Sequence, residues 1–440
     1  MRSDQQQAIN RLAGTSATAF LCAVLCVYPL YIDKFSNLGV TKFTGCFTLF
    51  LLFLLWLVAC TAIGARAPRP RNANAGRDVT LWGVLAFAGT SLISTFTSLS
   101  PTASTWGLGG YYGGLMLVLF TAAGYWAVRS YLDLENLDFV FWVLGITTSI
   151  VAVLYVLNIF NIDLIGAYAD TAVVERAQFF STLGQKDFNG CFFSVALPIV
   201  FYQFLNAKDT RTAVWTGIPA AFGALALAVV DSEALALGIG AAVMVLVCHK
   251  NFTTRHLRRA ALISAAFFGW AAWMHYMRAS VYTQGGTALL AKLGAWQVAL
   301  PCMAASLLLW LVLFVLARKG IAAQAPLYLP GRVITIAVLA VGALAFVLAN
   351  AMPNLPLPES LHNLLVFNDD WGTYRGVAWR AAFGTWADGS LLRKIVGIGP
   401  GMMHTAVAAW AGDAMTARMA TFYAAHNEYL EQLLTTGILG

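Results

Sequence analysis

Residues 139–158 read FVFWVLGITTSIVAVLYVLN, a stretch without a single charged side chain. A helix of that length rises about 30 Å, which matches the hydrocarbon core of a bilayer. A twelfth apolar stretch begins near His426. The other apolar stretches lie at 14–32, 42–64, 79–99, 112–128, 188–205, 213–230, 234–248, 260–277, 294–316 and 333–351. The sequence therefore predicts an all-α fold, a polytopic transmembrane helical bundle of about twelve spans.

Composition is typical of a membrane protein. Hydrophobic residues make up 59% of the 440 residues and charged residues only 11%, whereas soluble domains carry roughly 25% charged residues. A soluble multidomain protein is excluded, because the charges that would cover its surface are missing. The net charge of +7 indicates orientation in a bilayer rather than nucleic-acid binding.

Basic residues predict how the chain is oriented. With the N-terminus in the cytoplasm, the inner loops hold an excess of lysine and arginine, whereas the outer loop 100–111 holds no charge. This asymmetry is the positive-inside pattern, so we expect a multi-pass protein with a cytoplasmic N-terminus. The basic residues of the inner loops are Arg66, Arg69, Arg71, Arg77, Arg129, Lys208, Arg211, Lys250, Arg255, Arg258, Arg259, Arg318, Lys319 and Arg332.

Three regions follow from this topology. Residues 1–351 form the transmembrane helical bundle. Residues 352–425 form an extracytoplasmic loop that is too long for a turn and rich in aromatic residues, so we expect short helices and a catalytic role for it. Residues 426–440 start a further transmembrane helix. That stretch would rise only about 22 Å, so we expect the intact protein to continue with further spans.

His426 and Asn427 stand at the polar start of that last helix. A neutral imidazole at the mouth of an apolar helix can accept a proton at physiological pH. The alternative is that both residues only cap the helix. The middles of the spans hold almost no charged residue, whereas ion-coupled transporters usually bury such residues near the midplane. This favours chemistry at the membrane surface over transport through the protein.

Short motifs of glycine, aromatic and basic residues occur along the chain and concentrate near its end. They are Trp106-Gly107, Gly113-Gly114, Ser181-Thr182-Leu183-Gly184, Asn189-Gly190, Tyr374-Arg375-Gly376, Trp379-Arg380, Gly397-Ile398-Gly399-Pro400-Gly401 and His426-Asn427 followed by Gly437-x-x-Gly440. Together they resemble the motifs of the O-antigen ligase and O-antigen polymerase superfamily, which are bacterial membrane glycosyltransferases. The resemblance is specific from Tyr374 onward and looser before it.

The resemblance implies a reaction and a set of partners. An O-antigen ligase moves a glycan from undecaprenyl diphosphate to a hydroxyl of a glycan or glycolipid acceptor, at the outer face of the bacterial cytoplasmic (inner) membrane. The partners would be the lipid-linked donor, the acceptor and the lipid bilayer, and not nucleic acid. We expect no cofactor and no metal, because the adjacent acids Asp369 and Asp370 are a weak metal signal.

The resemblance also implies roles for individual residues. His426 would be the base that activates the acceptor hydroxyl, and the Arg375 guanidinium would hold the diphosphate leaving group. An alternative for Arg375 is an ion pair with Asp369 or Asp370. Arg176 and Lys186 are candidates for a second phosphate contact, with solvated loop charges as the alternative.

Asn189 and Asn427 complete the candidate substrate-binding residues. One position departs from the family, because this chain has Ser232-Glu233 where many members carry Ser-Arg. An acid at that position puts one phosphate contact in doubt. Two alternatives stay open: a polysaccharide polymerase of the same superfamily, which differs only in its acceptor, and a membrane transporter or flippase.

Overall fold

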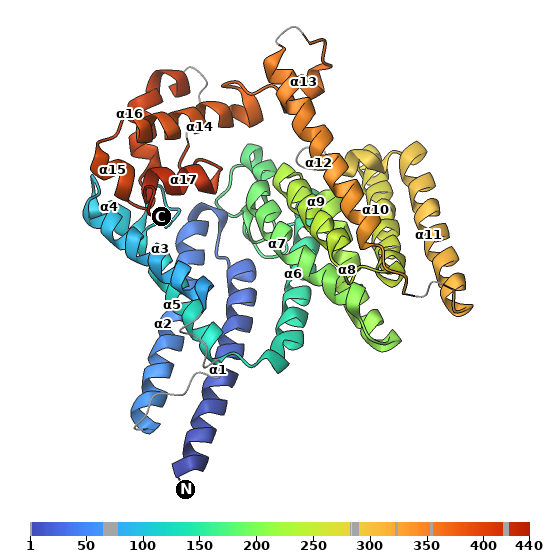
Figure 1. The fold of residues 1–440 in the computed structure, drawn as a ribbon, viewed down its shortest axis with the longest axis horizontal. Helices are drawn as coiled ribbons and strands as arrows, with labels where there is room; N and C mark the ends of the chain where they lie inside the picture. Colours follow the sequence, from blue (N-terminus) through green and yellow to red (C-terminus); the bar gives the residue numbers. More distant parts are fainter. Residues whose placement is uncertain are drawn as a thin grey trace. The chain divides into compact units, whose positions relative to one another are not determined.

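The computed structural model describes residues 2–64, 78–281, 283, 290–321, 324–352, 355–416 and 422–440. Within them the chain is mostly helical and divides into two compact units (Figure 1). Unit 1 comprises Met1–Ala17, Phe50–Leu132 and Leu339–Gly440, and unit 2 comprises Thr18–Leu49 and Asp133–Val338. The basic cluster Arg66–Arg77, on which the predicted orientation mainly depends, lies outside the described residues.

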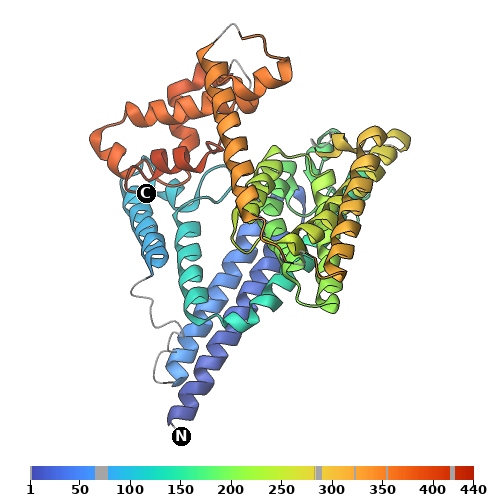
Figure 2. The same cartoon turned by 45° about the vertical axis from the view of Figure 1, so that its right-hand side comes forward.

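Unit 1 combines helices from the first third of the chain with its C-terminal segment. Three helices contribute to both units: α1 (Arg2–Leu30), α2 (Leu38–Gly64) and α12 (Tyr328–Ala351). The helices of unit 1 alone are α3 (Val79–Phe96), α4 (Pro101–Trp106), α5 (Leu115–Tyr131), α13 (Glu359–Leu365), α14 (Trp371–Ala387), α15 (Leu391–Val396), α16 (Met403–Thr416) and α17 (Glu428–Thr435). Helices α14 to α17 pack together (Figure 2). The apolar core between α14, α16 and α17 includes Ala378, Met403 and Leu434.

Unit 2 is a helical bundle with a short hairpin. Its helices are η1 (Phe35–Asn37), η3 (Leu134–Asn136), α6 (Leu137–Ile159), η4 (Val173–Gln178), α7 (Lys186–Asn206), α8 (Thr210–Val229), α9 (Glu233–Cys248), α10 (Thr254–Ser280), η5 (Leu290–Gly294) and α11 (Trp296–Arg318). Strand β1 (Phe179–Phe180) pairs antiparallel with β2 (Gly184–Gln185). Helix α8 packs against α6, α7 and α10. Close approach is possible because Gly223 of α8 lies directly against Leu197 of α7.

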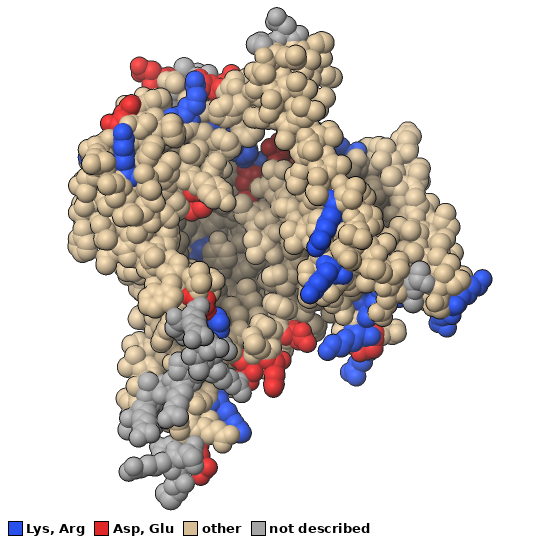
Figure 3. Space-filling view, in the orientation of Figure 1, with Lys and Arg blue, Asp and Glu red and all other residues tan. Residues whose placement is uncertain are grey.

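Eight helices in the described part of the chain are long and apolar enough to cross a membrane. They are α1, α2, α3, α6, α7, α8, α11 and α12. Large apolar side chains on these helices remain exposed: Val333 and Ile336 on α12 are 67% and 66% exposed. Uncharged side chains also dominate the face drawn in Figure 3. Because water would penalise such surface, the chain is a multi-pass helical membrane protein.

The predicted count of twelve spans is not confirmed. Helices α5 and α9 correspond to two of the remaining stretches, but they have only 17 and 16 residues. Helix α10 covers 27 residues and carries arginines near both ends. The stretch at 426–440 differs most, because α17 has eight residues and ends at Thr435. A span of roughly 30 Å would need about 20 residues.

A physical reason for the early end of α17 lies in the residues that follow it. Gly437 has a φ of 72°, which turns the chain out of the helix. The backbone N–H groups of Ile438 and Leu439 then donate to the carbonyls of Lys394 and Ile395. Sequence periodicity could not reveal these bonds, so the prediction of a transmembrane helix over 426–440 needs correction.

Candidate functional site

The glycine run Gly397-Ile398-Gly399-Pro400-Gly401 follows α15 and packs with its backbone against other segments of unit 1. Its three glycines have φ values of 79°, 105° and 70°, a region that glycine tolerates best. A Cβ atom on Gly397 would lie 2.3 Å from the carbonyl carbon of Thr435. A Cβ atom on Gly399 would lie 2.4 Å from the hydroxyl oxygen of Ser104. Larger residues would therefore push these segments apart.

Hydrogen bonds join this run to the end of α17. The N–H of Ile398 donates to the Leu434 carbonyl at 3.2 Å, and the N–H of Gly399 donates to the Thr435 carbonyl at 2.9 Å. On its other side, a Cβ on Gly401 would lie 2.9 Å from the Cα of Gly107. Unit 1 thus brings together three motifs that are far apart in the sequence: the Trp106-Gly107 motif, the glycine run and the segment that starts at His426.

Asn427 is the N-cap residue of α17. Its side-chain oxygen accepts hydrogen bonds from the N–H groups of Tyr429 at 3.1 Å and Leu430 at 3.3 Å. These donors would otherwise lack a partner at the helix start. The capping alternative therefore holds for this oxygen, and a contact between Asn427 and substrate stays a prediction.

His426 occupies an unusual backbone conformation one residue earlier. Its φ of 51° lies in the left-handed region, which costs a residue other than glycine on the order of 1 kcal/mol. The side chain is exposed, and its ring meets the edge of Phe422 at a centroid distance of 6.0 Å. An exposed imidazole on a constrained backbone can meet a substrate in a defined direction.

The peptide groups beside Ala425 hold this conformation in place. Ala425 is fully buried, its N–H donates to Oε2 of Glu431 at 2.7 Å, and its carbonyl accepts from Nε1 of Trp379 at 2.9 Å. Burial raises the pKa of Glu431 to about 7, against the opposing effect of the hydrogen bond from Ala425. The nearby carboxylate of Glu428 adds to the rise. Ala425, the residue before His426, is therefore held by hydrogen bonds at both its N–H and its carbonyl.

Arg375 directly follows the first turn of α14. This turn is irregular, because Gly372 and Tyr374 have φ values of 60° and 68°. Trp379 follows Arg375 by four residues, so the two side chains share one face of the helix. Since Trp379 bonds to Ala425, that face is directed toward the His426 segment.

Asp369 was one alternative partner for Arg375, and it forms an ion pair with Arg380. Arg380 is mostly exposed, with 58% of its side chain accessible. We infer that Arg380 serves to hold the loop before α14. The role of Arg375 itself stays a prediction.

His404 contributes to the same region, although no sequence motif surrounds it. Its Nδ1 lies 3.0 Å from the Phe422 carbonyl, and its ring stacks on Tyr423 at a centroid distance of 4.5 Å. Tyr423 in turn contacts the ring of Tyr111 at 5.3 Å. These contacts brace the chain just before His426.

Asn189 lies in unit 2, where it is completely buried. Its Oδ1 accepts from the Ser181 hydroxyl at 2.6 Å, and its Nδ2 donates to the carbonyls of Phe180 at 3.1 Å and Gly184 at 3.0 Å. These bonds fix the β1–β2 hairpin. A direct contact between Asn189 and substrate stays a prediction. It would require a bond to the substrate to replace one of these hydrogen bonds.

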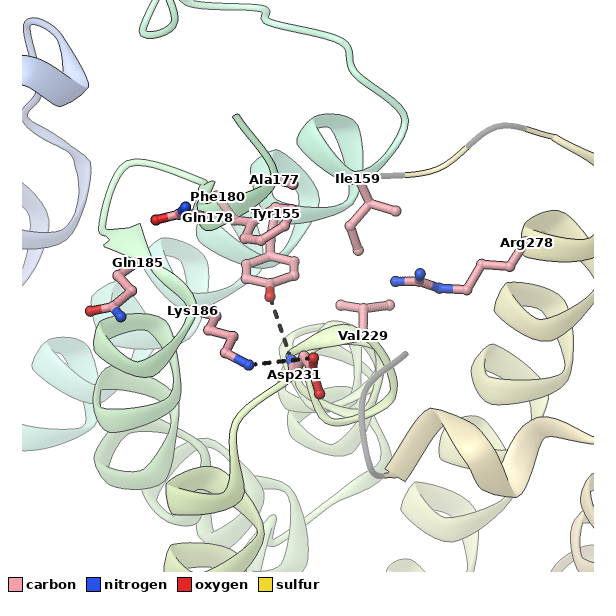
Figure 4. A pocket seen from close by; sticks show the side chains of 10 residues that line it. All are labelled: Tyr155, Ile159, Ala177, Gln178, Phe180, Gln185, Lys186, Val229, Asp231 and Arg278. Atoms are coloured by element: carbon pink, nitrogen blue, oxygen red, sulfur yellow. Dashed lines mark hydrogen bonds and ion pairs between the residues drawn. The ribbon is translucent and has the colours of Figure 1, made fainter. Parts of the chain in front are cut away.

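Lys186 begins α7 and lines a cavity of about 310 Å³ in unit 2 (Figure 4). Its Nζ lies 3.6 Å from the carboxylate of Asp231, whose N–H donates to the Tyr155 hydroxyl at 3.4 Å. Arg278 of α10 reaches into the cavity from the opposite side (Figure 4). The cavity can therefore present two cationic groups to a phosphate, with one carboxylate between them.

Arg278 was missed by the sequence reasoning, because no motif surrounds it and α10 reads as an ordinary apolar stretch. The only signal in the sequence is a basic side chain directly after the apolar stretch 260–277. Arg176 also lies in unit 2, on η4, but it does not line this cavity. Its guanidinium lies 5.4 Å from the centre of the Tyr168 ring, and its Nε donates to the Thr171 carbonyl at 3.5 Å.

The predicted site residues thus fall into two groups. Arg375, His426 and Asn427 belong to unit 1, and Arg176, Lys186 and Asn189 belong to unit 2. No group of three or more potential metal ligands occurs among the described residues. Comparisons of this chain with protein-family models, with curated proteins and with solved structures gave no match.

Proposed function

We propose that this chain is a membrane glycosyltransferase that moves a glycan from a polyprenyl diphosphate, of the undecaprenyl type, to an acceptor hydroxyl. The proposal rests on the motif resemblance and on one structural observation. The His426 ring is exposed, while the backbone just before it is fixed by Trp379 and Glu431 through Ala425. Such preorganisation suits a general base, which must lie within hydrogen-bond reach of the proton it takes.

The proposed reaction is a single displacement at the anomeric carbon of the donor glycan. The imidazole of His426 takes the proton of the acceptor hydroxyl as that oxygen forms the new glycosidic bond. The bond between the anomeric carbon and the diphosphate oxygen breaks, and polyprenyl diphosphate leaves with the electron pair. Release of the diphosphate supplies the driving force, so the chain's own residues need only take the acceptor proton, position the substrates and stabilise the leaving group.

Cationic side chains would stabilise the charge that develops on the leaving diphosphate. Arg375 is the candidate in unit 1, because it shares a helix face with Trp379, which bonds beside His426. Lys186 is the candidate in unit 2, where Arg278 lines the same cavity and Arg176 lies on the preceding helix. Asp231, which pairs with Lys186, would partly neutralise that cation in the absence of substrate.

By the proposed orientation, the reaction takes place at the outer face of the bacterial cytoplasmic membrane. Acceptor identity separates an O-antigen ligase from a polymerase. Purified protein in nanodiscs, given a lipid-linked oligosaccharide and each acceptor, distinguishes them: one shifted band indicates a ligase, and a ladder of products indicates a polymerase.

Substitution of His426 tests the assignment of the base. We expect His426→Asn to lower the transfer rate by about 10²- to 10⁴-fold, with little loss of stability, because asparagine tolerates the left-handed region. His426→Ala should lower the rate equally but also lose some stability. Transfer rates and melting temperatures of both variants separate these effects. Activity retained by the asparagine variant would remove His426 from the mechanism.

A further inference from the structure

A second cavity lies at one end of unit 2, away from the Lys186 cavity. It has a volume of about 670 Å³ and forms where α7 ends, α8 and α10 begin and α11 ends. Lys and Arg side chains gather at this end of the unit (Figure 3). Helices α7, α8 and α11 are candidate membrane spans, so their ends mark the level of a membrane surface.

The charge of this cavity is strongly unbalanced. One carboxylate, that of Asp209, lines it. Asp209 is already engaged as the N-cap of α8, where it accepts from the N–H of Thr212 at 2.8 Å. The cationic side chains that line the cavity are Lys208, Arg255, Arg258 and Arg259. None of these four forms an ion pair with a carboxylate in the described part of the chain.

Two of the four cations are committed to holding the helices together. Arg255 donates to the Ala207 carbonyl, and Arg259 donates to the Leu205 carbonyl at 2.8 Å, so both satisfy carbonyls at the end of α7. Lys208 and Arg258 differ, because neither is committed to a carbonyl of α7 in this way. Lys208 is exposed, and the Arg258 guanidinium lies 5.9 Å from the centre of the Phe314 ring.

Apart from Thr210 and Gln324, the rest of the cavity wall is apolar. Phe204 of α7 and Trp310 and Phe314 of α11 line it on candidate membrane spans. Leu262 of α10 adds to this apolar surface. A small soluble anion would find partners among the cations but would leave this apolar wall uncovered. An amphiphile whose anionic head is attached to hydrocarbon chains would contact both parts.

We propose that this cavity binds the headgroup of an anionic phospholipid from the surrounding bilayer, with its phosphate between Lys208 and Arg258 and an acyl chain along Trp310 and Phe314. Basic pockets between membrane helices are suited to such headgroups, because each buried phosphate oxygen finds a cationic donor. The proposal is independent of glycosyl transfer, since none of these residues takes part in the proposed reaction.

Thermal unfolding of the full chain in detergent, with added lipid, tests the proposal. The probes are phosphatidylglycerol, zwitterionic phosphatidylcholine and inorganic phosphate. We expect phosphatidylglycerol alone to raise the melting temperature in a saturable way. The double variant Lys208→Gln/Arg258→Gln should bind it about tenfold more weakly, while retaining the melting temperature of the unsubstituted protein in phosphatidylcholine.

The matched control is Lys250→Gln, which removes a basic residue from the neighbouring turn but not from the cavity. This variant should respond to phosphatidylglycerol as the unsubstituted protein does. Equal stabilisation by both lipids would overturn the proposal, as would an undiminished response of the double variant. Stabilisation by inorganic phosphate at matched concentration would also overturn it, because a soluble anion would then be sufficient. Native mass spectrometry gives the same comparison if the double variant unfolds too easily.

Discussion

Each unit contains a turn with a left-handed residue other than glycine: the turn before α17 in unit 1 and the β1–β2 hairpin turn in unit 2. In unit 1 this residue is His426, with a φ of 51°, and in unit 2 it is Ser181, with a φ of 56°. An asparagine follows each turn, Asn427 as a helix cap and Asn189 as a buried link between backbone groups. The two turns differ in their side chains, because His426 is exposed whereas Ser181 is 1% exposed.

This difference shows what such a turn can be used for. In the unit 2 turn the Ser181 hydroxyl is buried and donates to Asn189, whose amide also satisfies the hairpin from within. In unit 1 the hydrogen bonds of Trp379 and Glu431 restrain the backbone through Ala425, while the exposed His426 ring contacts Phe422. Burial of Ser181 therefore indicates a structural role for the unit 2 turn, whereas the exposed His426 keeps the unit 1 turn as the candidate for function.

The largest expected effect tests how far the unit 1 turn depends on the glycine run. Gly397→Ala should destabilise the protein by about 3–5 kcal/mol, because its Cβ would lie 2.3 Å from the Thr435 backbone. Thermal or denaturant unfolding in detergent measures this loss. Gly110→Ala is the control, because Gly110 has a similar φ of 75° but open space within 4 Å of where its Cβ would lie. That control should lose only about 1 kcal/mol, and equal losses would argue against the close packing.

The next effect concerns the buried turn of unit 2. Asn189→Ala should cost about 3 kcal/mol, because it leaves the Ser181 hydroxyl and the carbonyls of Phe180 and Gly184 without their buried partner. The melting temperature reports this change. A variant as stable as the unsubstituted protein would show that water replaces the amide and that the turn is more open than its burial indicates.

A pH dependence distinguishes the unit 1 turn. Burial raises the pKa of Glu431 to about 7, so the folded state holds this proton more tightly than the unfolded state does. Its contribution is fully present below about pH 4.5 and is lost as the pH rises through 7. We expect the stability of the unsubstituted protein to fall by about 2 kcal/mol between pH 5 and pH 8 through this group.

Glu431→Gln should remove that part of the pH dependence, because the carboxamide oxygen can still accept the Ala425 N–H without titrating. Melting temperatures measured from pH 5 to pH 8 make the comparison. Glu428→Gln is the control, since Glu428 is exposed and should leave most of the slope in place. An unchanged slope in the Glu431 variant would show that another group titrates.

The smallest effect is expected at the helix cap of unit 1. Asn427→Ala should cost about 1 kcal/mol, because the N–H groups of Tyr429 and Leu430 lose a partner that water can replace. Its ratio to the Asn189→Ala loss, measured by the same unfolding assay, compares the two turns directly. A loss as large as that of Asn189→Ala would mean that Asn427 also holds the His426 turn.

Sequence alone was sufficient for the class of protein. Uncharged stretches such as 139–158 need a helix in lipid, because backbone groups there have no water to bond with. Helix α6 (Leu137–Ile159) confirms that stretch, and α12 (Tyr328–Ala351) confirms the one at 333–351. The sequence also indicated His426, as an ionisable ring at the polar start of a helix, and the motif resemblance indicated the glycine run.

Only the tertiary structure decided how these pieces act together. The helix at 428–435 ends where bonds to Lys394 and Ile395 replace further turns, and no local pattern encodes such partners. The same holds for Arg278, which lines the same cavity as Lys186 but comes from α10, about 90 residues away in the sequence. Local sequence propensity determines where helices form, because it depends on residues that are close together in the chain. Sites depend on contacts between distant segments, which form only when the helices pack.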